Sequence, residues 1–160
     1  MKYIISKDGN VKLIVAGNFE HTEEKNIFFN YLKKYGLQGN VIYKGFLPDK
    51  DLYREIATSK VMIYPSHSDS FSIAVSQALA LRTPVVVYDI AGLSEYKDMR
   101  AVRFVNEFDY ESMAVESMKI LNMDDVTSLF DYSIDRFLNE RTWEKVAEQY
   151  DIMFRKYTQK

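Results

Sequence analysis

The sequence predicts an α/β fold, a Rossmann-like three-layer sandwich with a mostly parallel sheet, followed by C-terminal helices. Short apolar runs rich in β-branched residues alternate with segments of helical periodicity, which is the pattern of βαβ units. The runs are apolar along their whole length, as expected for strands that helices cover on both faces of a parallel sheet. From residue 109 onward the pattern is helical to the end.

The predicted elements follow one another in regular order. The first strand is "VKLIVAG" at 11–17, and the next helix falls within 19–36, where Gly36 suits the helix end. The segment "YIIS" at 3–6 is either the end of a helix, which we favour, or a short strand that turns at "DGN". The remaining predicted strands are 40–45, 61–65, 84–89 and 101–105, and the remaining helices are 48–59, with Asp49 as its cap, 72–81, 109–121, 124–138 and 141–157.

Composition narrows the classes of function. A chain of 160 residues suits one compact domain, so we expect residues 1–160 to form a single unit. A net charge of −2 without a run of Lys or Arg argues against nucleic-acid binding. The chain has no cysteine and two distant histidines, so a metal site is not expected. No stretch reads as a membrane span or a signal peptide, and the expected location is cytoplasmic.

A polar loop marks the candidate site. Residues 66–72 ("SHSDSFS") join the strand at 61–65 to the next helix, and ligands of parallel sheets bind at the carboxyl ends of strands. Unpaired N–H groups at a helix start suit a phosphate, whereas the Asp69 carboxylate suits the hydroxyls of a sugar. Gln77 is a polar residue among apolar neighbours and could face the ligand. In the alternative interpretation, Asp69 or Ser70 only caps the helix, worth about 1 kcal/mol, and the loop has no ligand.

The remaining patterns argue against several classes of enzyme and leave an aromatic stripe near the C-terminus to explain. The sequence has no Walker loop, no Gly-x-Gly-x-x-Gly and no plausible Ser-His-Asp set, which argues against a P-loop nucleotidase, a dehydrogenase and a hydrolase. Aromatic residues recur at helical spacing near the C-terminus, and packing in the core is their ordinary explanation. If that stripe is exposed, a homodimer becomes an option. Its main members are Trp143, Tyr150, Phe154 and Tyr157.

Four short motifs follow one another in this chain: "YPS" at 64–66, "DSFS" at 69–72, "QALALRTPVV" at 77–86 and "AGLSE" at 91–95. Their order resembles the C-terminal domain of family 4 glycosyltransferases, which have the GT-B fold. That family carries a strand, Pro-Ser, Glu-x-Phe-Gly and then Glu-Ala-x-Ala-x-Gly-x-Pro-Val-Val, with the two Glu eight positions apart. The resemblance extends over about residues 11–157, including "RTWEKVAEQYDIMFRKY" as the terminal helix.

The resemblance implies metal-independent, retaining transfer of a hexose from a nucleoside diphosphate sugar to a glycan or lipid-linked acceptor. Asp69 takes the place of the family's first Glu, which contacts the donor sugar, and is the implied catalytic residue. Gln77 takes the place of the second Glu, which binds ribose. His67 either points into the site or caps a helix. The other implied donor-binding residues are Gly45, Phe46, Ser66, Ser70, Phe71, Ser72, Gly92 and Glu95.

Several positions depart from the family. Asp69 is one methylene shorter than Glu, and Gln77 lacks the charge. The family's domain opens with a central strand and a Gly-Arg…Lys segment, which "MKYIISKDGN" does not match. The N-terminal, acceptor-binding domain is also missing, so the helix at 139–160 would pack toward an absent partner. We expect the chain alone to be inactive, and a non-catalytic nucleotide-binding remnant or partner subunit is the alternative. The full enzyme could associate peripherally with the inner face of a membrane.

Overall fold

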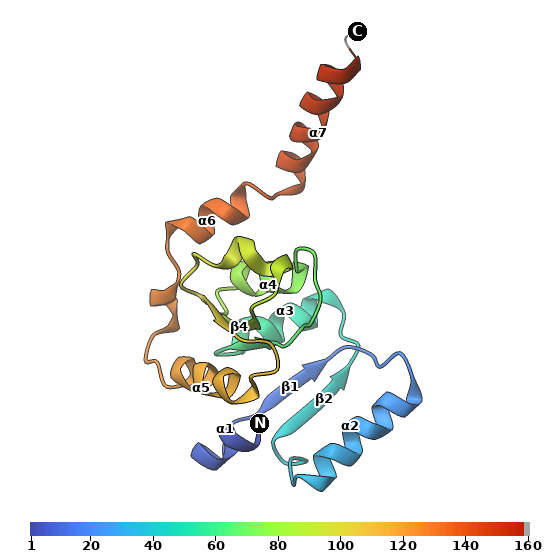
Figure 1. Cartoon of the computed structure of the whole chain (residues 1–160), viewed down its shortest axis with the longest axis vertical. Helices are drawn as coiled ribbons and strands as arrows, with labels where there is room; N and C mark the ends of the chain where they lie inside the picture. Colours follow the sequence, from blue (N-terminus) through green and yellow to red (C-terminus); the bar gives the residue numbers. More distant parts are fainter. Residues whose placement is uncertain (159–160) are drawn as a thin grey trace.

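The computed structural model describes residues 1–158 and confirms the α/β class (Figure 1). Parallel strands alternate with helices, and two helices close the chain. In order, the elements are α1 (Lys2–Lys7), β1 (Leu13–Ala16), α2 (Thr22–Lys34), β2 (Val41–Gly45), α3 (Asp49–Thr58), β3 (Met62–Tyr64), α4 (Ile73–Ala80), β4 (Val85–Tyr88), the 3-10 helix η1 (Ala91–Tyr96), β5 (Val102–Val105), α5 (Tyr110–Leu121), the 3-10 helix η2 (Val126–Leu129), α6 (Tyr132–Asn139) and α7 (Trp143–Thr158).

The strands form two parallel sheets and not the single sheet that the sequence suggests. In one, β1 pairs with β2, and Leu13 lies opposite Val41. In the other, β4 is the central strand, and Val85 lies between Met62 of β3 and Val102 of β5. Within residues 1–158, no backbone hydrogen bonds join β1 to β3, and this divides the sheet.

The main hydrophobic core surrounds β4, whose four residues are fully buried. Its buried members come from residues 75–137, with α4, η1, β5, α5 and α6 contributing. The β1–α2–β2 unit packs instead around a small aromatic cluster of Phe19, Phe28, Phe29 and Tyr43. The loop at 66–72 is therefore attached to the better-packed part of the molecule.

The ends of several helices are set by local chemistry. The predicted helix at 124–138 is interrupted, because the side chain of Asp125 caps η2 and that of Asp131 caps α6. The helical interpretation of 3–6 is confirmed by α1, and the strand interpretation is wrong. Gly36 follows α2 with a φ of +64°, a conformation that glycine adopts without strain. Helix α3 begins at Asp49, after Pro48 as the N-cap, so Asp49 does not cap it.

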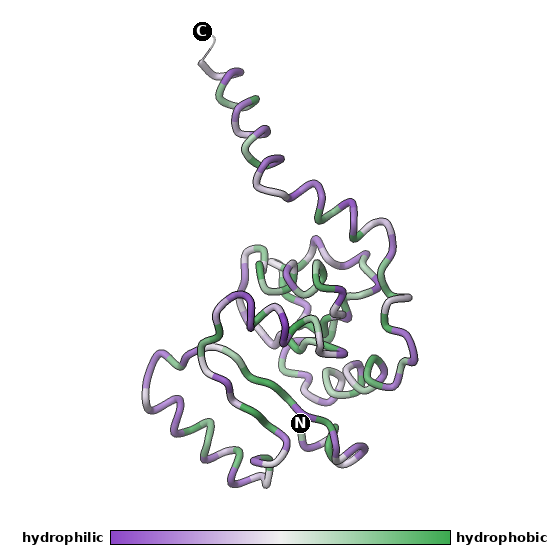
Figure 2. Tube along the Cα trace, turned by 180° about the vertical axis from the view of Figure 1, so that it is seen from behind, coloured by the Kyte–Doolittle hydropathy of each residue, from purple (hydrophilic) through white to green (hydrophobic). Residues whose placement is uncertain are grey.

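Helix α7 leaves the body of the molecule, and none of its residues is buried. Core packing of the aromatic stripe is therefore wrong for this chain: Trp143 is 86% exposed and Tyr157 is 70% exposed. Figure 2 shows apolar and polar residues alternating along this projecting helix. The last two residues of the predicted 139–160 segment lie outside the described residues. Among those described, no helix combines the length and apolarity needed to cross a membrane.

Candidate functional site

Residues 66–72, here called the site loop, connect the carboxyl end of β3 to α4. The N-cap of α4 is Ser72 rather than Asp69 or Ser70, and its hydroxyl accepts from the N–H of Val75 at 3.3 Å. Ser72 is buried and has a φ of +57°, in the left-handed region. The family pattern has Gly at this position, and the conformation explains why, because glycine adopts it without strain. In this chain, the hydrogen bond by which Ser72 caps α4 offsets part of the strain of its left-handed conformation.

The Asp69 carboxylate folds back onto the site loop. Its Oδ1 accepts from the backbone N–H groups of Phe71 at 3.0 Å and Ser72 at 2.7 Å. Its Oδ2 accepts from the hydroxyl of Tyr64 at 2.5 Å. The two amides predicted to meet a diphosphate thus already have a carboxylate partner. A bound diphosphate would have to displace Asp69 or use other donors.

These hydrogen bonds predict a specific pH dependence of stability. The Tyr64 hydroxyl, followed by the amides of Phe71 and Ser72, lowers the pKa of Asp69 from 3.8 to about 2. Because the folded-state pKa is the lower one, the stabilisation is present above pH 3.8 and is lost as the pH falls toward 2. We expect the free energy of unfolding to drop by about 1–2 kcal/mol from this group over that range. Carbon-13 titration of the Asp69 carboxyl measures it directly, and a midpoint near 3.8 would contradict the hydrogen-bonded geometry.

Helix η1 braces the site loop from the side. Gly92 packs so closely that a Cβ there would lie 1.8 Å from the backbone oxygen of Asp69. The hydroxyl of the fully buried Tyr96 donates to the carbonyl of Phe71 at 2.8 Å. The hydroxyl oxygen of Tyr96 also lies 2.7 Å from Ser76 Oγ. Gly92, which the resemblance predicts to bind the donor, contacts the backbone of the site loop at Asp69 and Ser70. Sequence reasoning gave no role to Tyr64, the first residue of the quoted "YPS", or to Tyr96, which directly follows "AGLSE".

Other predicted site residues contact protein partners. His67 Nδ1 lies 2.6 Å from Glu107 Oε1, and its ring stacks on Phe108. This contact ties the site loop to the segment that follows β5. Gln77 donates from Nε2 to the Tyr53 hydroxyl of α3 at 3.3 Å. Ser66 Oγ donates to the carbonyl of Ser68, within the loop itself.

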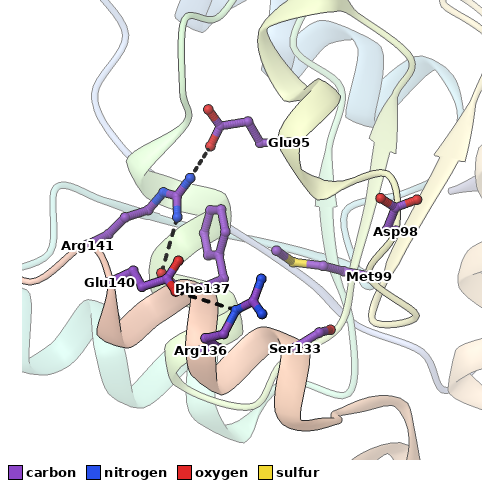
Figure 3. A pocket seen from close by; sticks show the side chains of 8 residues that line it. All are labelled: Glu95, Asp98, Met99, Ser133, Arg136, Phe137, Glu140 and Arg141. Atoms are coloured by element: carbon purple, nitrogen blue, oxygen red, sulfur yellow. Dashed lines mark hydrogen bonds and ion pairs between the residues drawn. The ribbon is translucent and has the colours of Figure 1, made fainter.

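Glu95 lies in a pocket of about 240 Å³ between η1 and α6. Figure 3 shows its carboxylate directed toward Arg141, and the two groups form a 2.6 Å ion pair. The Arg141 guanidinium also stacks over the ring of Phe137, 3.7 Å from its centroid. Arg141, which sequence reasoning missed, thereby holds Glu95 against the segment between α6 and α7.

Gly45 and Phe46 lie at the carboxyl end of β2, in the sheet that β1 and β2 form. Gly45 ends β2 with a φ of +64°, and its carbonyl accepts from the N–H of Gly17, which follows β1, at 2.8 Å. The ring of Phe46 is 70% exposed. The predicted residues therefore fall into two groups, one at the end of each sheet. In the part of the chain that the structure describes, no cluster of three or more His, Asp or Glu residues could hold a metal ion.

Comparison with known proteins identifies a family, a curated relative and solved structures of similar fold. The family model for glycosyl transferases group 1 matches residues 1–130. The capsular polysaccharide biosynthesis glycosyltransferase CapM of Staphylococcus aureus is 24% identical over 96% of this chain, which spans 41% of that protein. Among solved structures, sucrose-phosphate synthase of Thermosynechococcus elongatus has a TM-score of 0.82 at 20% identity, with 98% of this chain and 41% of that one covered. Anabaena HepE in complex with UDP-glucose has a TM-score of 0.78 at 15% identity, covering 94% and 43% of the two chains.

Proposed function

The chain belongs to the glycosyl transferases group 1 family, and from this premise we propose that it is the donor-binding part of a retaining hexosyltransferase. The donor would be a nucleoside diphosphate sugar, and the acceptor a glycan or a lipid-linked glycan. The observation that carries the proposal is the site loop, in which a carboxylate accepts from the backbone amides of Phe71 and Ser72 at the start of α4, just after the carboxyl end of β3. One of the similar structures, HepE, was solved with UDP-glucose.

Each site residue has a proposed role in holding the donor. The Asp69 carboxylate would exchange its amide partners for hydroxyls of the sugar, leaving the N–H groups of Phe71 and Ser72 to the diphosphate. Gln77 would turn from Tyr53 to the ribose, and the chain at Gly45 and Phe46 would line the base. Gly92 and Tyr96 would hold the loop in place without touching the donor.

The reaction itself needs more than this chain. The chain spans about two fifths of the length of the relatives described above. We therefore assign acceptor binding to a further domain, with α7 directed toward it, and residues 1–160 to one donor-binding unit. The whole enzyme would act in the cytoplasm, at the inner face of the membrane if its acceptor is lipid-linked.

A charge restored at Gln77 tests the proposed ribose contact. A charge-assisted hydrogen bond is worth about 1 kcal/mol more than a neutral one, so Gln77→Glu should bind UDP or GDP about fivefold more tightly. Inorganic pyrophosphate, which has no ribose, should bind the variant no better. The dissociation constants can be measured by calorimetry.

A matched control separates the contact from net charge. Gln149→Glu makes the same change on the exposed helix α7 and should leave nucleotide affinity unaltered. Equal affinity of Gln77→Glu and the parent chain for both nucleotides would contradict the assignment of Gln77.

A second candidate function is a non-catalytic subunit or remnant that keeps the fold. The specific observation that favours it is the Asp69 carboxylate, which occupies the amides of Phe71 and Ser72. Under this alternative, Asp69 and Gln77 are structural groups, and the weak nucleotide binding that the chain keeps is the same in Asp69→Ala and Gln77→Ala.

A further inference from the structure

We propose that Arg141 is a positioning residue for the site loop, and that it acts through the ring of Phe137 to hold the backbone of Phe71 in place. Arg141 lies between the end of α6 and the start of α7. It acts through other side chains and not by contact with a donor. The use of the Phe71 amide by a donor rests on the function proposed above, whereas the positioning of the loop can be tested without any ligand.

Phe71 joins the packing of its side chain to the hydrogen bonds of the site loop. Its N–H donates to Asp69 Oδ1 at 3.0 Å, and its carbonyl accepts from the Tyr96 hydroxyl at 2.8 Å. Its ring packs against the main core. Because ring and backbone belong to one residue, a shift of the ring displaces the amide that donates to Asp69. The geometry of the site loop therefore depends on what fixes the Phe71 ring.

Three rings from three elements pack together at this point. Phe71 of the site loop, Tyr96 of η1 and Phe137 of α6 are here called the ring cluster. The centroids of Phe71 and Phe137 lie 6.3 Å apart, with 17° between the ring planes, and Tyr96 lies within 6.2 Å of both. Aromatic rings at such separations attract one another beyond the effect of burial alone. Phe137 thus carries the position of α6 to the site loop.

Helix α6 is a firmly held support for the ring cluster. Its Ile134 is fully buried in the main core. The side chain of Asp131 caps its start, and Asp135 forms a 2.6 Å ion pair with Arg82, which follows α4. A helix held by its core residue, its cap and an ion pair provides a fixed surface against which the Phe71 ring can pack.

The Arg141 guanidinium covers the exposed side of the ring cluster. Its central carbon lies 3.7 Å from the centroid of Phe137 and 6.0 Å from that of Phe71. The 2.6 Å ion pair with Glu95 orients the group (Figure 3). A planar guanidinium stacks on an aromatic face and is attracted to it as a cation. Because Glu95 belongs to η1, Arg141 ties η1 and α6 together above the Phe71 ring.

The site loop needs such a support because Ser72, the residue after Phe71, is strained. Its φ of +57° is in the left-handed region. A residue other than glycine keeps such a conformation only where the surrounding structure holds it. The N–H of Val75 holds the Ser72 side chain, and the ring cluster holds the neighbouring Phe71. Loosening the ring cluster should therefore let the loop relax.

Amide exchange and titration of Asp69 test this positioning in the ligand-free chain. In Arg141→Ala, the amides of Phe71 and Ser72 should exchange about tenfold faster than in the parent chain. The midpoint of the Asp69 carboxyl titration should rise from about 2 toward 3.8, because the carboxylate loses amide partners. The matched control is Arg136→Ala, which removes another arginine of α6, paired with Glu140 at 3.4 Å, and should change neither measurement. Unaltered exchange and midpoint in Arg141→Ala, or equal changes in the control, would overturn the proposal.

Two further variants separate stacking from charge and from stability. Arg141→Lys keeps a positive charge beside Glu95 but lacks the planar guanidinium, so the loop amides should still exchange faster than in the parent chain. Ile134→Val trims the buried face of α6 and should lower the free energy of unfolding without a selective effect on the loop amides. Full rescue by lysine, or selective loop opening in Ile134→Val, would overturn the proposal.

Nucleotide binding tests the part that rests on the proposed function. Arg141→Ala should bind UDP or GDP about threefold or more weakly than the parent chain, because fewer molecules hold the loop in its binding conformation. Equal affinities, with the loop amides disturbed, would overturn a role for Arg141 in donor binding. If the parent chain bound neither nucleotide, the proposed function would fail instead, and the ligand-free measurements would still decide whether Arg141 positions the loop.

Discussion

Replacing Gly92 with alanine is expected to lower the free energy of unfolding by about 3 kcal/mol and to displace the site loop. The added Cβ would lie 1.8 Å from the backbone oxygen of Asp69 and 3.2 Å from the amide nitrogen of Ser70. Because both are backbone atoms, no side-chain rotation relieves the clash, and either η1 or the loop must move. Urea unfolding measures the stability change, and amide shifts of residues 66–72 report the displacement.

Gly39 offers the matched control for this substitution. A Cβ at Gly39 would meet no atom within 4 Å, so Gly39→Ala should change stability by no more than about 0.5 kcal/mol. If Gly92→Ala were as stable as Gly39→Ala, with unaltered loop shifts, the close packing of η1 against the site loop would be wrong.

The second large effect compares two buried tyrosines. Tyr96→Phe should cost about 2 kcal/mol, because it removes the hydroxyl that donates to Phe71 and leaves buried polar groups without a partner. Tyr88 is equally buried, yet its hydroxyl has no hydrogen-bond partner within the described residues. Tyr88→Phe should therefore leave stability unchanged or raise it by about 1 kcal/mol.

Denaturant unfolding of the two variants checks this difference. Phenylalanine keeps the ring in both cases, so core packing is matched and only the hydroxyl is tested. Equal losses in the two variants would show that the Tyr96 hydrogen bonds do not hold the site loop. Loop shifts in Tyr96→Phe, absent from Tyr88→Phe, would support its role as a brace.

The alternation of strands and helices was predictable because it depends on local pattern. The apolar run "VVVY" of β4 and the small-residue helix α4 are visible in the sequence. Strand β4 is fully buried, and α4 buries Val75, Ala78 and Leu79. The division into two sheets was not predictable in the same way, because the pairing of strands depends on how distant segments pack and not on the pattern within each strand. The exposure of Trp143 is a similar case, since periodicity identifies an apolar face but not what covers it.

The sequence predicts which loop forms the candidate site but not which residues the side chains of that loop contact. The turn at 66–72 and the polar residues Asp69 and Gln77 were identified by type and spacing. Their partners come from other elements: Tyr64 from β3 and Tyr53 from α3. Those contacts depend on how helices settle on the sheet, and residue spacing along one segment does not encode them.

Nitrogen-15 chemical-shift titration of the chain with UDP, GDP and their hexose conjugates tests the proposed donor site most directly. If the donor binds there, shifts should be confined to residues 66–77 and the Gly45–Phe46 turn, with one base preferred and the response lost in Asp69→Ala and Gln77→Ala. Shifts elsewhere, such as around the pocket of Glu95 and Arg141, or none up to millimolar ligand, would contradict it.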